Sequence, residues 1–318
     1  METRILGTSN IRVSALGLGC MGMNDFPSIR YKNEARNIIL KALDFGITLF
    51  DTSDAYGPFA SEEFLGLALR GRRHEAVIAT KFGIQVDLKT KRSIGVCGRP
   101  EYVRQSCEAS LKRLGIEEID LYYYHRVDPN VPIEETVGAM GDLVKQGKVR
   151  FLGISEASLP ALSSLIYRAH RTHPIAAVQV EYALWMRDCE REVLTACREL
   201  GIALAAYSPL GRGFLTGFLK RREDIAPWDN RRCLPRFQSG RFERNYEIVR
   251  RIEVLARKRN ITAAQLSLAW LLHQGKDIIP IFGTKNLEHL EENVKAVSIQ
   301  LTPADLYVLG QAIMKSVS

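Results

Sequence analysis

Four side chains that can hold or transfer a proton follow short apolar runs in the first half of the sequence. A carboxylate, Asp51, ends one run and a phenol, Tyr56, follows it by five residues, while two later runs end in Lys81 and His125. A phenol has an ordinary pKa near 10 and donates its proton slowly at neutral pH. A neighbouring ammonium lowers that pKa, and a carboxylate paired with the lysine keeps it charged and oriented.

Together the four residues are suited to delivering a proton to a carbonyl oxygen, with a neutral imidazole holding that oxygen by a hydrogen bond. Taken singly, Lys81 fits a structural ion pair with Asp51, Tyr56 fits simple packing, and His125 fits an ordinary hydrogen-bonding role. All four together at successive strand ends favour the catalytic interpretation. The carbonyl carbon then needs a hydride, which no side chain supplies, so a redox cofactor is implied.

The positions of these residues depend on eight apolar runs of four to eight residues, most of them followed by an amphipathic helical stretch. The runs are Ala15–Gly19, Ile47–Asp51, Val77–Lys81, Ile119–His125, Val149–Ser155, Ala176–Glu181, Ile202–Ser208 and Ile278–Gly283. Continuous apolar runs of this length are typical of parallel strands buried on both faces. Eight of them alternating with helices predict an α/β fold, a (β/α)8 TIM barrel, whose chemistry lies at the C-terminal ends of the strands.

The pattern places the helices at about 33–46, 61–70, 100–114, 134–147, 158–170, 188–200, 241–259, 262–273 and 286–297. Ser61, Ser158, Thr262 and Asn286 are the predicted N-caps, because Ser, Thr and Asn side chains accept hydrogen bonds from the first-turn N–H groups.

Two further segments complete the predicted architecture. Two β-prone pieces around Gly7–Asn10 predict an N-terminal β-hairpin that caps the closed end of the barrel. The thirty or so residues after strand 7, from Ser208 to about Gly240, are rich in Gly, Pro and Arg. Loops of that length are commonly functional, and we expect this one to cover the mouth as a cofactor clasp or lid. We find no linker, so residues 1–318 are expected to form a single domain.

The segment from Gly17 to Gly22 matches the glycine pattern of a dinucleotide-binding, doubly wound fold. That motif requires a helix starting among the glycines, so that its N-terminus faces a pyrophosphate. Here Met23–Lys32 intervenes, contains Pro27 and lacks a helical pattern. We therefore prefer the barrel, in which the glycines form a turn or let the first strand approach a ligand.

Composition excludes several other classes. The 318 residues carry a net charge of +8, but 44 basic and 36 acidic residues are interspersed, which argues against nucleic-acid binding. No apolar stretch is long enough for a membrane span, and the N-terminus lacks a signal peptide. Six cysteines without paired or metal-like spacing suggest a reducing cytoplasm. The HxxH pair His170 and His173 falls at a predicted helix end, and we expect no metal there.

The whole chain resembles the aldo-keto reductases. The segments Asp51–Gly57, Thr80–Phe82 and Tyr124–Arg126 are similar to those that carry the family's catalytic Asp, Tyr, Lys and His. Asn230–Phe237 in the long loop is similar to the corresponding segment in a branch of this family made up of bacterial and plant oxidoreductases. The resemblance implies carbonyl reduction with NADPH, and Tyr56 as the proton donor.

The same resemblance implies where NADPH/NADP+ binds. The motifs at Gly153–Ser158, Gln179–Tyr182, Tyr207–Gly213 and Ile281–Asn293 imply these contacts: Ser155, Gln179, Tyr207, Ser208, Leu210, Arg212, Gly283, Thr284, Lys285, His289, Glu292 and Asn293. Tyr207 offers a face for the nicotinamide, and Ser155 and Gln179 can hold its carboxamide. Gly283–Lys285 precedes a helix, so backbone N–H groups, the helix dipole and an ammonium form an anion site.

Three functions follow from these residues. We expect an NADPH-dependent reductase of a small aldehyde or ketone. An alternative is a redox sensor or regulatory protein of the same fold that binds NADPH with little turnover. A third is a dehydrogenase preferring NAD, which Lys285 disfavours. We expect the substrate pocket to be lined by Met23–Tyr31, Phe82, Arg126, Trp185 and Trp228.

Overall fold

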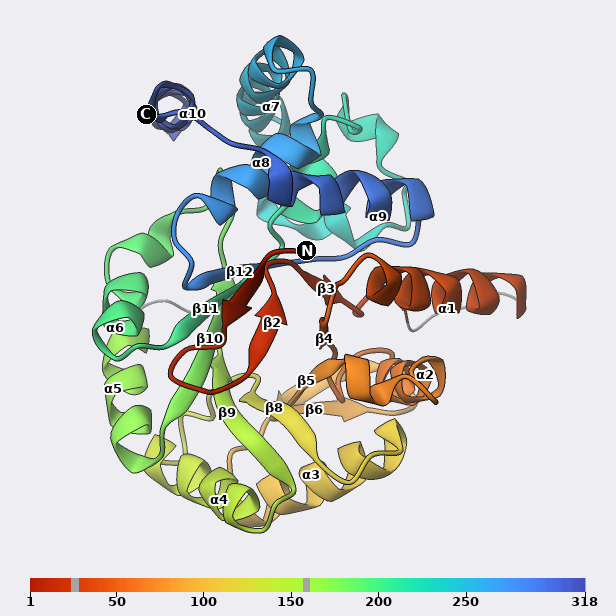
Figure 1. Ribbon diagram of the computed structural model, residues 1–318, viewed down its shortest axis with the longest axis vertical. Coiled ribbons are helices and arrows are strands. Elements are labelled where there is room, and N and C mark those ends of the chain that lie inside the picture. The colour runs from red at the N-terminus through yellow and green to blue at the C-terminus, as the bar shows by residue number, and fades with distance from the viewer. Residues whose placement is uncertain (24–28, 157–160, 318) are drawn as a thin grey trace.

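The computed structural model describes residues 1–23, 29–156 and 161–317. Parallel strands close into a barrel in the order β10-β11-β12-β3-β4-β5-β8-β9 (Figure 1). These strands are β3 (Gly17–Gly19), β4 (Leu49–Asp51), β5 (Val77–Phe82), β8 (Ile119–Tyr124), β9 (Val149–Ser155), β10 (Ile175–Glu181), β11 (Ala203–Tyr207) and β12 (Ile278–Phe282). Each overlaps one of the predicted apolar runs, so the predicted barrel is confirmed.

The strands are apolar throughout because both faces of the sheet are buried. Leu49 packs inside the barrel while its neighbour Phe50 packs outward against the helices. In β8, Leu121 and Tyr123 face the interior cluster and Tyr122 faces the outer one. Successive side chains of a strand point to opposite faces, so each barrel strand contributes to two hydrophobic layers.

Helices surround the barrel, as Figure 1 shows. They are α1 (Ile29–Asp44), α2 (Ala60–Ala68), α3 (Pro100–Leu114), α4 (Ile133–Lys145), α5 (Leu162–Thr172), α6 (Val193–Glu199), α7 (Arg241–Lys258), α8 (Ala263–Leu272), α9 (Leu287–Val294) and α10 (Pro303–Val317). The last was not predicted. None of the described helices is long and apolar enough to span a membrane.

The predicted caps have different outcomes. Thr262 accepts a hydrogen bond from the N–H of Gln265, and Asn286 caps α9. The prediction for Ser61 is wrong, because α2 begins at Ala60 with Phe59 at the N-cap position, and Ser61 Oγ instead donates to the carbonyl of Cys20 (3.1 Å). Ser158 lies outside the described residues.

The predicted N-terminal hairpin is formed by β1 (Thr3–Ile5) and β2 (Arg12–Ser14), and it closes the end of the barrel where the strands begin. Between its strands, Gly7 has φ +57°, and a Cβ there would lie 2.3 Å from the carbonyl oxygen of Ala176. Only glycine fits so close to the start of β10.

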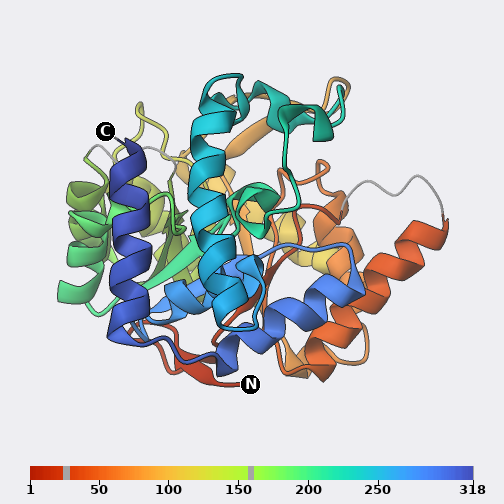
Figure 2. The same ribbon diagram turned by 90° about the horizontal axis from the view of Figure 1, so that it is seen from above.

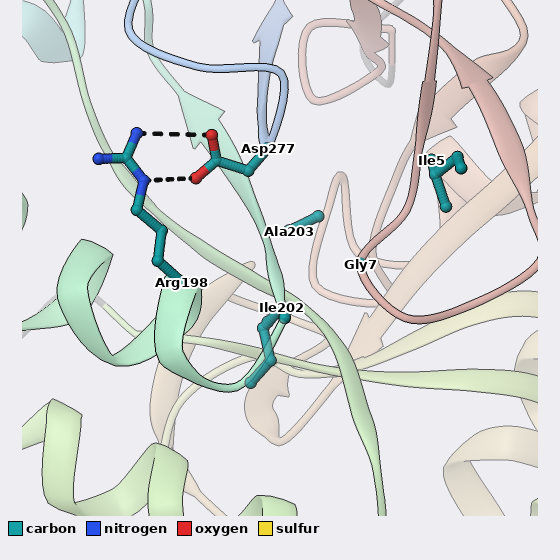
Figure 3. A pocket seen from close by; sticks show the side chains of 7 residues that line it. Ile5, Gly7, Arg198, Ile202, Ala203 and Asp277 are labelled. Atoms are coloured by element: carbon teal, nitrogen blue, oxygen red, sulfur yellow. Dashed lines mark hydrogen bonds and ion pairs between the residues drawn. The ribbon is translucent and has the colours of Figure 1, made fainter.

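A hollow of about 300 Å³ lies beside this hairpin (Figure 3). It is lined by Ile5, Gly7, Arg198, Gly201, Ile202, Ala203 and Asp277. Its two charged side chains are paired with each other, with Arg198 Nε 2.8 Å from Asp277 Oδ2. The hollow is at the opposite end of the barrel from the proton-transfer residues, so it does not form part of their site.

Two segments lie beyond the C-terminal ends of the strands. A hairpin of β6 (Ile84–Asp87) and β7 (Arg92–Val96) follows β5 and was not predicted. The long segment after β11 lies at the end of the barrel opposite the N-terminus, as Figure 2 shows in teal. It contains short 3-10 turns at Gly211–Thr216, Arg222–Asp224, Asn230–Cys233 and Pro235–Phe237.

Aromatic packing anchors this long segment. The ring of Phe214 stacks on Trp185 with centroids 5.0 Å apart and meets Phe237 and Phe242 edge-on at 5.5 and 4.8 Å. These buried contacts hold the segment against the barrel and α7, so sequence without periodicity nevertheless forms a packed layer.

Candidate active site

Lys81 and Asp51 form a buried ion pair at the C-terminal ends of β5 and β4, which are adjacent strands. The Lys81 ammonium is fully buried and donates to the Asp51 carboxylate, to the carbonyl of Thr52 (2.7 Å) and to the hydroxyl of Tyr56 (3.4 Å). A buried ammonium is costly unless it is paired and hydrogen-bonded. This one has three acceptors, and one of them is the phenol predicted to donate a proton.

Gln179 reaches the same carboxylate from β10, across the barrel. Its Nε2 donates to Asp51 Oδ2 (2.7 Å), and its side chain also hydrogen-bonds Tyr123. Both carboxylate oxygens of Asp51 therefore have partners. The carboxamide contact predicted for Gln179 would compete with this hydrogen bond, which the sequence did not indicate.

His125 follows β8 and lies beside the phenol. Its ring meets that of Tyr56 edge-on, with centroids 5.8 Å apart, and its Nδ1 lies 3.1 Å from Ser53 Oγ. Burial holds the pKa of His125 well below its ordinary value, and the positive charges of Lys81 and Arg126 lower it further. The imidazole is therefore neutral at neutral pH, as the sequence-based hypothesis requires.

The pKa of Tyr56 differs from the sequence-based expectation. Burial raises it above the ordinary value of 10, and the nearby Lys81 lowers it by less than burial raises it. For Lys81, burial lowers the pKa, but Asp51 and Tyr56 together raise it above its ordinary value. The phenol thus stays protonated and the ammonium stays charged across the neutral range.

The residues predicted to contact the nicotinamide lie at the ends of β9 and β11. Ser155 is buried, and its Oγ accepts a long hydrogen bond from Arg126 (3.4 Å). Tyr207 is half-buried at the end of β11. Beyond it, Ser208 and Arg212 adopt left-handed backbone angles. Leu210, which lies between them in the sequence, is buried. Arg212 is exposed, and its carbonyl accepts a hydrogen bond from Arg231 (3.0 Å).

The residues predicted to contact the adenosine phosphate follow β12. Lys285 is exposed and lies against the glycine turn after β3, since a Cβ on Gly22 would be 3.1 Å from Lys285 Cε. Gly283 approaches the end of β3, because a Cβ there would lie 3.4 Å from the carbonyl oxygen of Gly19. Thr284 Oγ1 accepts a hydrogen bond from the N–H of Asn286 (3.1 Å).

The backbone N–H groups at the start of α9 are less available to an anion than the sequence suggested. Asn286 Oδ1 accepts from the N–H groups of Glu288 (2.7 Å) and His289 (3.2 Å), so these two donors already have a partner. Glu292 accepts a hydrogen bond from the Thr262 hydroxyl, and Asn293 is buried. The predicted anion site therefore depends mainly on Lys285.

The residues predicted to line the substrate pocket have different outcomes. Phe82 is fully buried and stacks on Tyr122 and Tyr124 with centroids 4.8 and 5.3 Å apart, in the layer between barrel and helices. It faces outward because its neighbour Lys81 faces the site, so the pocket prediction for Phe82 is wrong. Trp228 is 85% exposed, and residues 24–28 of the predicted lining lie outside the described chain.

A second buried charge cluster lies behind the site and was missed by the sequence analysis. Glu62 is fully buried and accepts hydrogen bonds from Thr80 Oγ1 (2.5 Å) and Arg113 Nε (2.6 Å). Asp54 is only 4% exposed, and burial together with the charge of Glu62 raises its pKa to about 8, although Arg113 opposes this. The available signal was a second acid in the polar segment from Asp51 to Tyr56.

The titration of Asp54 predicts a pH-dependent stability. Between about pH 4 and 8 the folded protein keeps a proton on Asp54 that the unfolded chain releases, so the free energy of unfolding falls as pH rises through this window. A pKa difference of one unit between the folded and unfolded states is worth about 1.4 kcal/mol, so the wild type should lose on the order of a few kcal/mol of unfolding free energy across this window. Asp54→Asn has no carboxyl group to titrate and should not show this loss.

Urea unfolding at about pH 5 and about pH 9 measures this effect. The exposed Asp188→Asn is the matched control and should leave the wild-type pH dependence unchanged. Parallel pH dependences for wild type and Asp54→Asn would contradict the prediction.

The residues described contain no group of three or more His, Cys, Asp or Glu side chains arranged to hold a metal ion. Of the HxxH pair, His170 Nδ1 accepts a hydrogen bond from the N–H of Ile175 (3.2 Å) at the end of α5.

Comparisons with known proteins identify a family that the chain resembles over nearly its whole length. The sequence profile of the Aldo/keto reductase family matches residues 15–312. A probable aldo-keto reductase of Glycine max is 46% identical over 314 residues, which cover 97% of this chain and 88% of that protein. A glycerol dehydrogenase from Gluconobacter oxydans has a similar structure (TM-score 0.88, 29% identity, 99% and 96% of the chains covered). An aldo/keto reductase from Klebsiella pneumoniae, solved with NADP and acetate, is also similar (TM-score 0.77, 25% identity, 98% and 95% covered).

Proposed function

The chain belongs to the aldo/keto reductase family of NAD(P)-dependent oxidoreductases, and from that premise we propose that residues 1–318 form one domain that reduces a small aldehyde or ketone to an alcohol with NADPH. The observation that carries the proposal is the contact of the buried Lys81 ammonium with both Asp51 and the Tyr56 hydroxyl. This arrangement places the hydroxyl proton of Tyr56 next to the fixed positive charge of Lys81.

In the proposed reaction each side chain has a separate task. Tyr56 donates its proton to the carbonyl oxygen, and Lys81 stabilises the phenolate that this leaves. Asp51, held by Gln179, keeps Lys81 charged and in place. His125 is neutral, so it can hold the carbonyl oxygen by a hydrogen bond without adding a second positive charge.

The residues around the barrel mouth fit NADPH. Tyr207 offers a half-buried aromatic face at the end of β11, and β12, which carries Lys285 just beyond its end, pairs with β11. Ser155 would hold the carboxamide and Lys285 the adenosine phosphate, with Ser208, Leu210, Arg212 and Asn293 as further contacts. When bound, NADPH supplies the hydride for the carbonyl carbon.

The direct test is oxidation of NADPH, followed by absorbance, with small aldehydes, aromatic aldehydes, dicarbonyls and ketones. Because one structural relative is named a glycerol dehydrogenase, glycerol and other small alcohols are assayed with NADP+ in the reverse direction. Continuous turnover that disappears in Tyr56→Phe supports the proposal. Tight NADPH binding with a single turnover and then no further reaction would favour the redox sensor instead.

Cofactor preference tests the anion site separately. NADPH carries a ribose phosphate that NADH lacks, and a hydrogen bond to a charged group is worth about 1.5–3 kcal/mol. Since about 1.4 kcal/mol is tenfold in affinity, Lys285→Ala should weaken NADPH by roughly 10–100-fold and leave NADH nearly unchanged. Higher salt should narrow the wild-type preference, because Lys285 is exposed and its charge is screened.

Fluorescence titration gives both dissociation constants. Lys295→Ala is the matched control, because it removes an exposed lysine just past the other end of α9. Equal losses for NADPH and NADH in Lys285→Ala would show that this lysine does not recognise the phosphate. Tighter binding of NADH than NADPH by the wild type would overturn the assignment of NADPH as cofactor.

A further inference from the structure

The buried hydroxyl of Ser53 connects the site to the second charge cluster. Ser53 is fully buried in the segment between β4 and α2, and its Oγ lies 3.1 Å from His125 Nδ1 and 3.2 Å from Asp54 Oδ1. The same oxygen accepts the N–H of Ala55 (3.1 Å) and lies 3.4 Å from the carbonyl of Lys81. A serine has one proton to donate, so these acceptors compete for it.

The direction of the Ser53 hydroxyl determines the tautomer of His125. A neutral imidazole carries one N–H and one lone pair. If Ser53 donates to Nδ1, the ring proton must be on Nε2. If Ser53 instead accepts from Nδ1, then Nε2 carries the lone pair. A carbonyl oxygen is an acceptor, so only the tautomer protonated at Nε2 can hydrogen-bond it.

We propose that Ser53 is a positioning residue that donates to His125 Nδ1 and so keeps the ring proton on Nε2, and that ionisation of Asp54 reverses this hydrogen bond. The proposal rests on the proposed carbonyl reduction, because it assigns His125 the task of holding the substrate oxygen. With Asp54 protonated, its oxygen is a weak competitor for the Ser53 proton. With Asp54 ionised, the carboxylate attracts that proton more strongly, since charge-assisted hydrogen bonds are about twice as strong as neutral ones.

The charges around both ends of this connection are consistent with such a switch. Asp54 faces Glu62 on α2 and Arg113 on α3, and burial raises its pKa to about 8, within the range where the enzyme can be assayed. The phenols of Tyr102 on α3 and Tyr122 on β8 also face Asp54, and burial raises the pKa of each.

The positive charges of Lys81 and Arg126 lower the pKa of His125, and its ring lies edge-on to that of Tyr56. Burial and these two positive charges keep the imidazole neutral, so over this range its tautomer can change without a change in its charge. Tyr56 has a pKa raised above 10, so its own titration falls at higher pH than that of Asp54.

Nitrogen-15 NMR of the histidine rings tests the proposal without requiring turnover, because protonated and unprotonated ring nitrogens have separate chemical shifts. The His125→Gln variant identifies the His125 signals among those of the six histidines. We expect the wild type to carry the proton on Nε2 below about pH 8 and to shift toward Nδ1 above it. In Ser53→Ala the two tautomers should mix at every pH, and in Asp54→Asn the population should no longer depend on pH.

Steady-state kinetics provides the second measurement. Ser53→Ala should lower kcat/KM by about 2–10-fold at neutral pH, the effect expected from one neutral hydrogen bond. In the wild type kcat/KM should decline near pH 8, and Asp54→Asn should remove this decline. A second decline at higher pH, caused by loss of the Tyr56 proton, should remain. Ser61→Ala is the matched control, because it removes another fully buried hydroxyl from the neighbouring helix without contact to His125.

The outcomes separate this inference from the proposed function. An unchanged His125 tautomer in Ser53→Ala, or an unchanged pH dependence of the tautomer in Asp54→Asn, overturns the inference even if activity falls. A loss of activity in Ser53→Ala with an unchanged tautomer would show that Ser53 has only a structural role. Absence of carbonyl reduction by the wild type would overturn the proposed function, while the NMR result would still show whether Ser53 and Asp54 control the tautomer.

Discussion

Tyr56→Phe is expected to lower kcat for carbonyl reduction by about 10²–10⁴-fold, the usual contribution of general acid catalysis. The variant loses the proton that the carbonyl oxygen needs. The fold should persist, because among the described residues the Tyr56 hydroxyl has one side-chain hydrogen bond, a long one of 3.4 Å from Lys81. NADPH affinity should change little, since the predicted cofactor contacts lie on other strands.

Stopped-flow measurement of NADPH oxidation under single-turnover conditions separates the chemical step from product release. Tyr246→Phe is the matched control, because Tyr246 lies on α7, where its ring stacks on Phe242 and meets Lys220 and Arg250 rather than the proton-transfer residues. It should keep wild-type kcat. If Tyr56→Phe retained a tenth or more of wild-type kcat, Tyr56 would not be the proton donor.

Lys81→Met should also suppress reduction, with kcat falling by on the order of 10²-fold or more, since both the charge beside the phenol and its hydrogen bond are lost. Lys81 lowers the pKa of Tyr56 against the larger effect of burial. Without it the pKa rises further, so the phenol becomes a weaker acid. The high-pH decline of kcat, which reflects loss of the Tyr56 proton, should therefore move to still higher pH.

This substitution also leaves the Asp51 carboxylate buried without its ammonium, and breaking a buried ion pair can cost about 3–5 kcal/mol. The double variant Lys81→Met/Asp51→Asn removes both charges and is the control for stability. It should recover much of the thermal stability and remain inactive. A wild-type rate and pH profile in Lys81→Met would make Lys81 a structural cation only.

The sequence determined the barrel and the end of it that carries the chemistry. A strand buried on both faces must be apolar along its length, so each barrel strand was readable as a continuous run. A polar residue that ends such a run lies at the rim of the barrel, so the sequence alone places Asp51, Lys81 and His125 at the same end. The glycines from Gly17 to Gly22 form β3 and the turn after it, as expected for the barrel, because a phosphate-binding helix would have to start within them. The expectation that Met23–Lys32 lacks a helix is wrong at its end, since α1 already begins at Ile29.

Contacts between segments distant in sequence were decided only by the tertiary structure. The hydrogen bond from Gln179 to Asp51 joins residues 128 positions apart, and the proximity of Ser53 to His125 depends on how the segment after β4 folds over β8. Local periodicity carries no information about such pairs, because it describes the face on which a residue lies and not the partner that it meets.

The balance of charge and burial was likewise not readable from the sequence. The residue types alone indicated that Lys81 lowers the pKa of Tyr56, but the structure adds a desolvation effect that is larger and opposite. The raised pKa of Asp54 arises in the same way, from burial beside Glu62. Desolvation depends on everything packed around a group, so it is a property of the folded chain as a whole, whereas the position of each group at a strand end is a property of its own short segment.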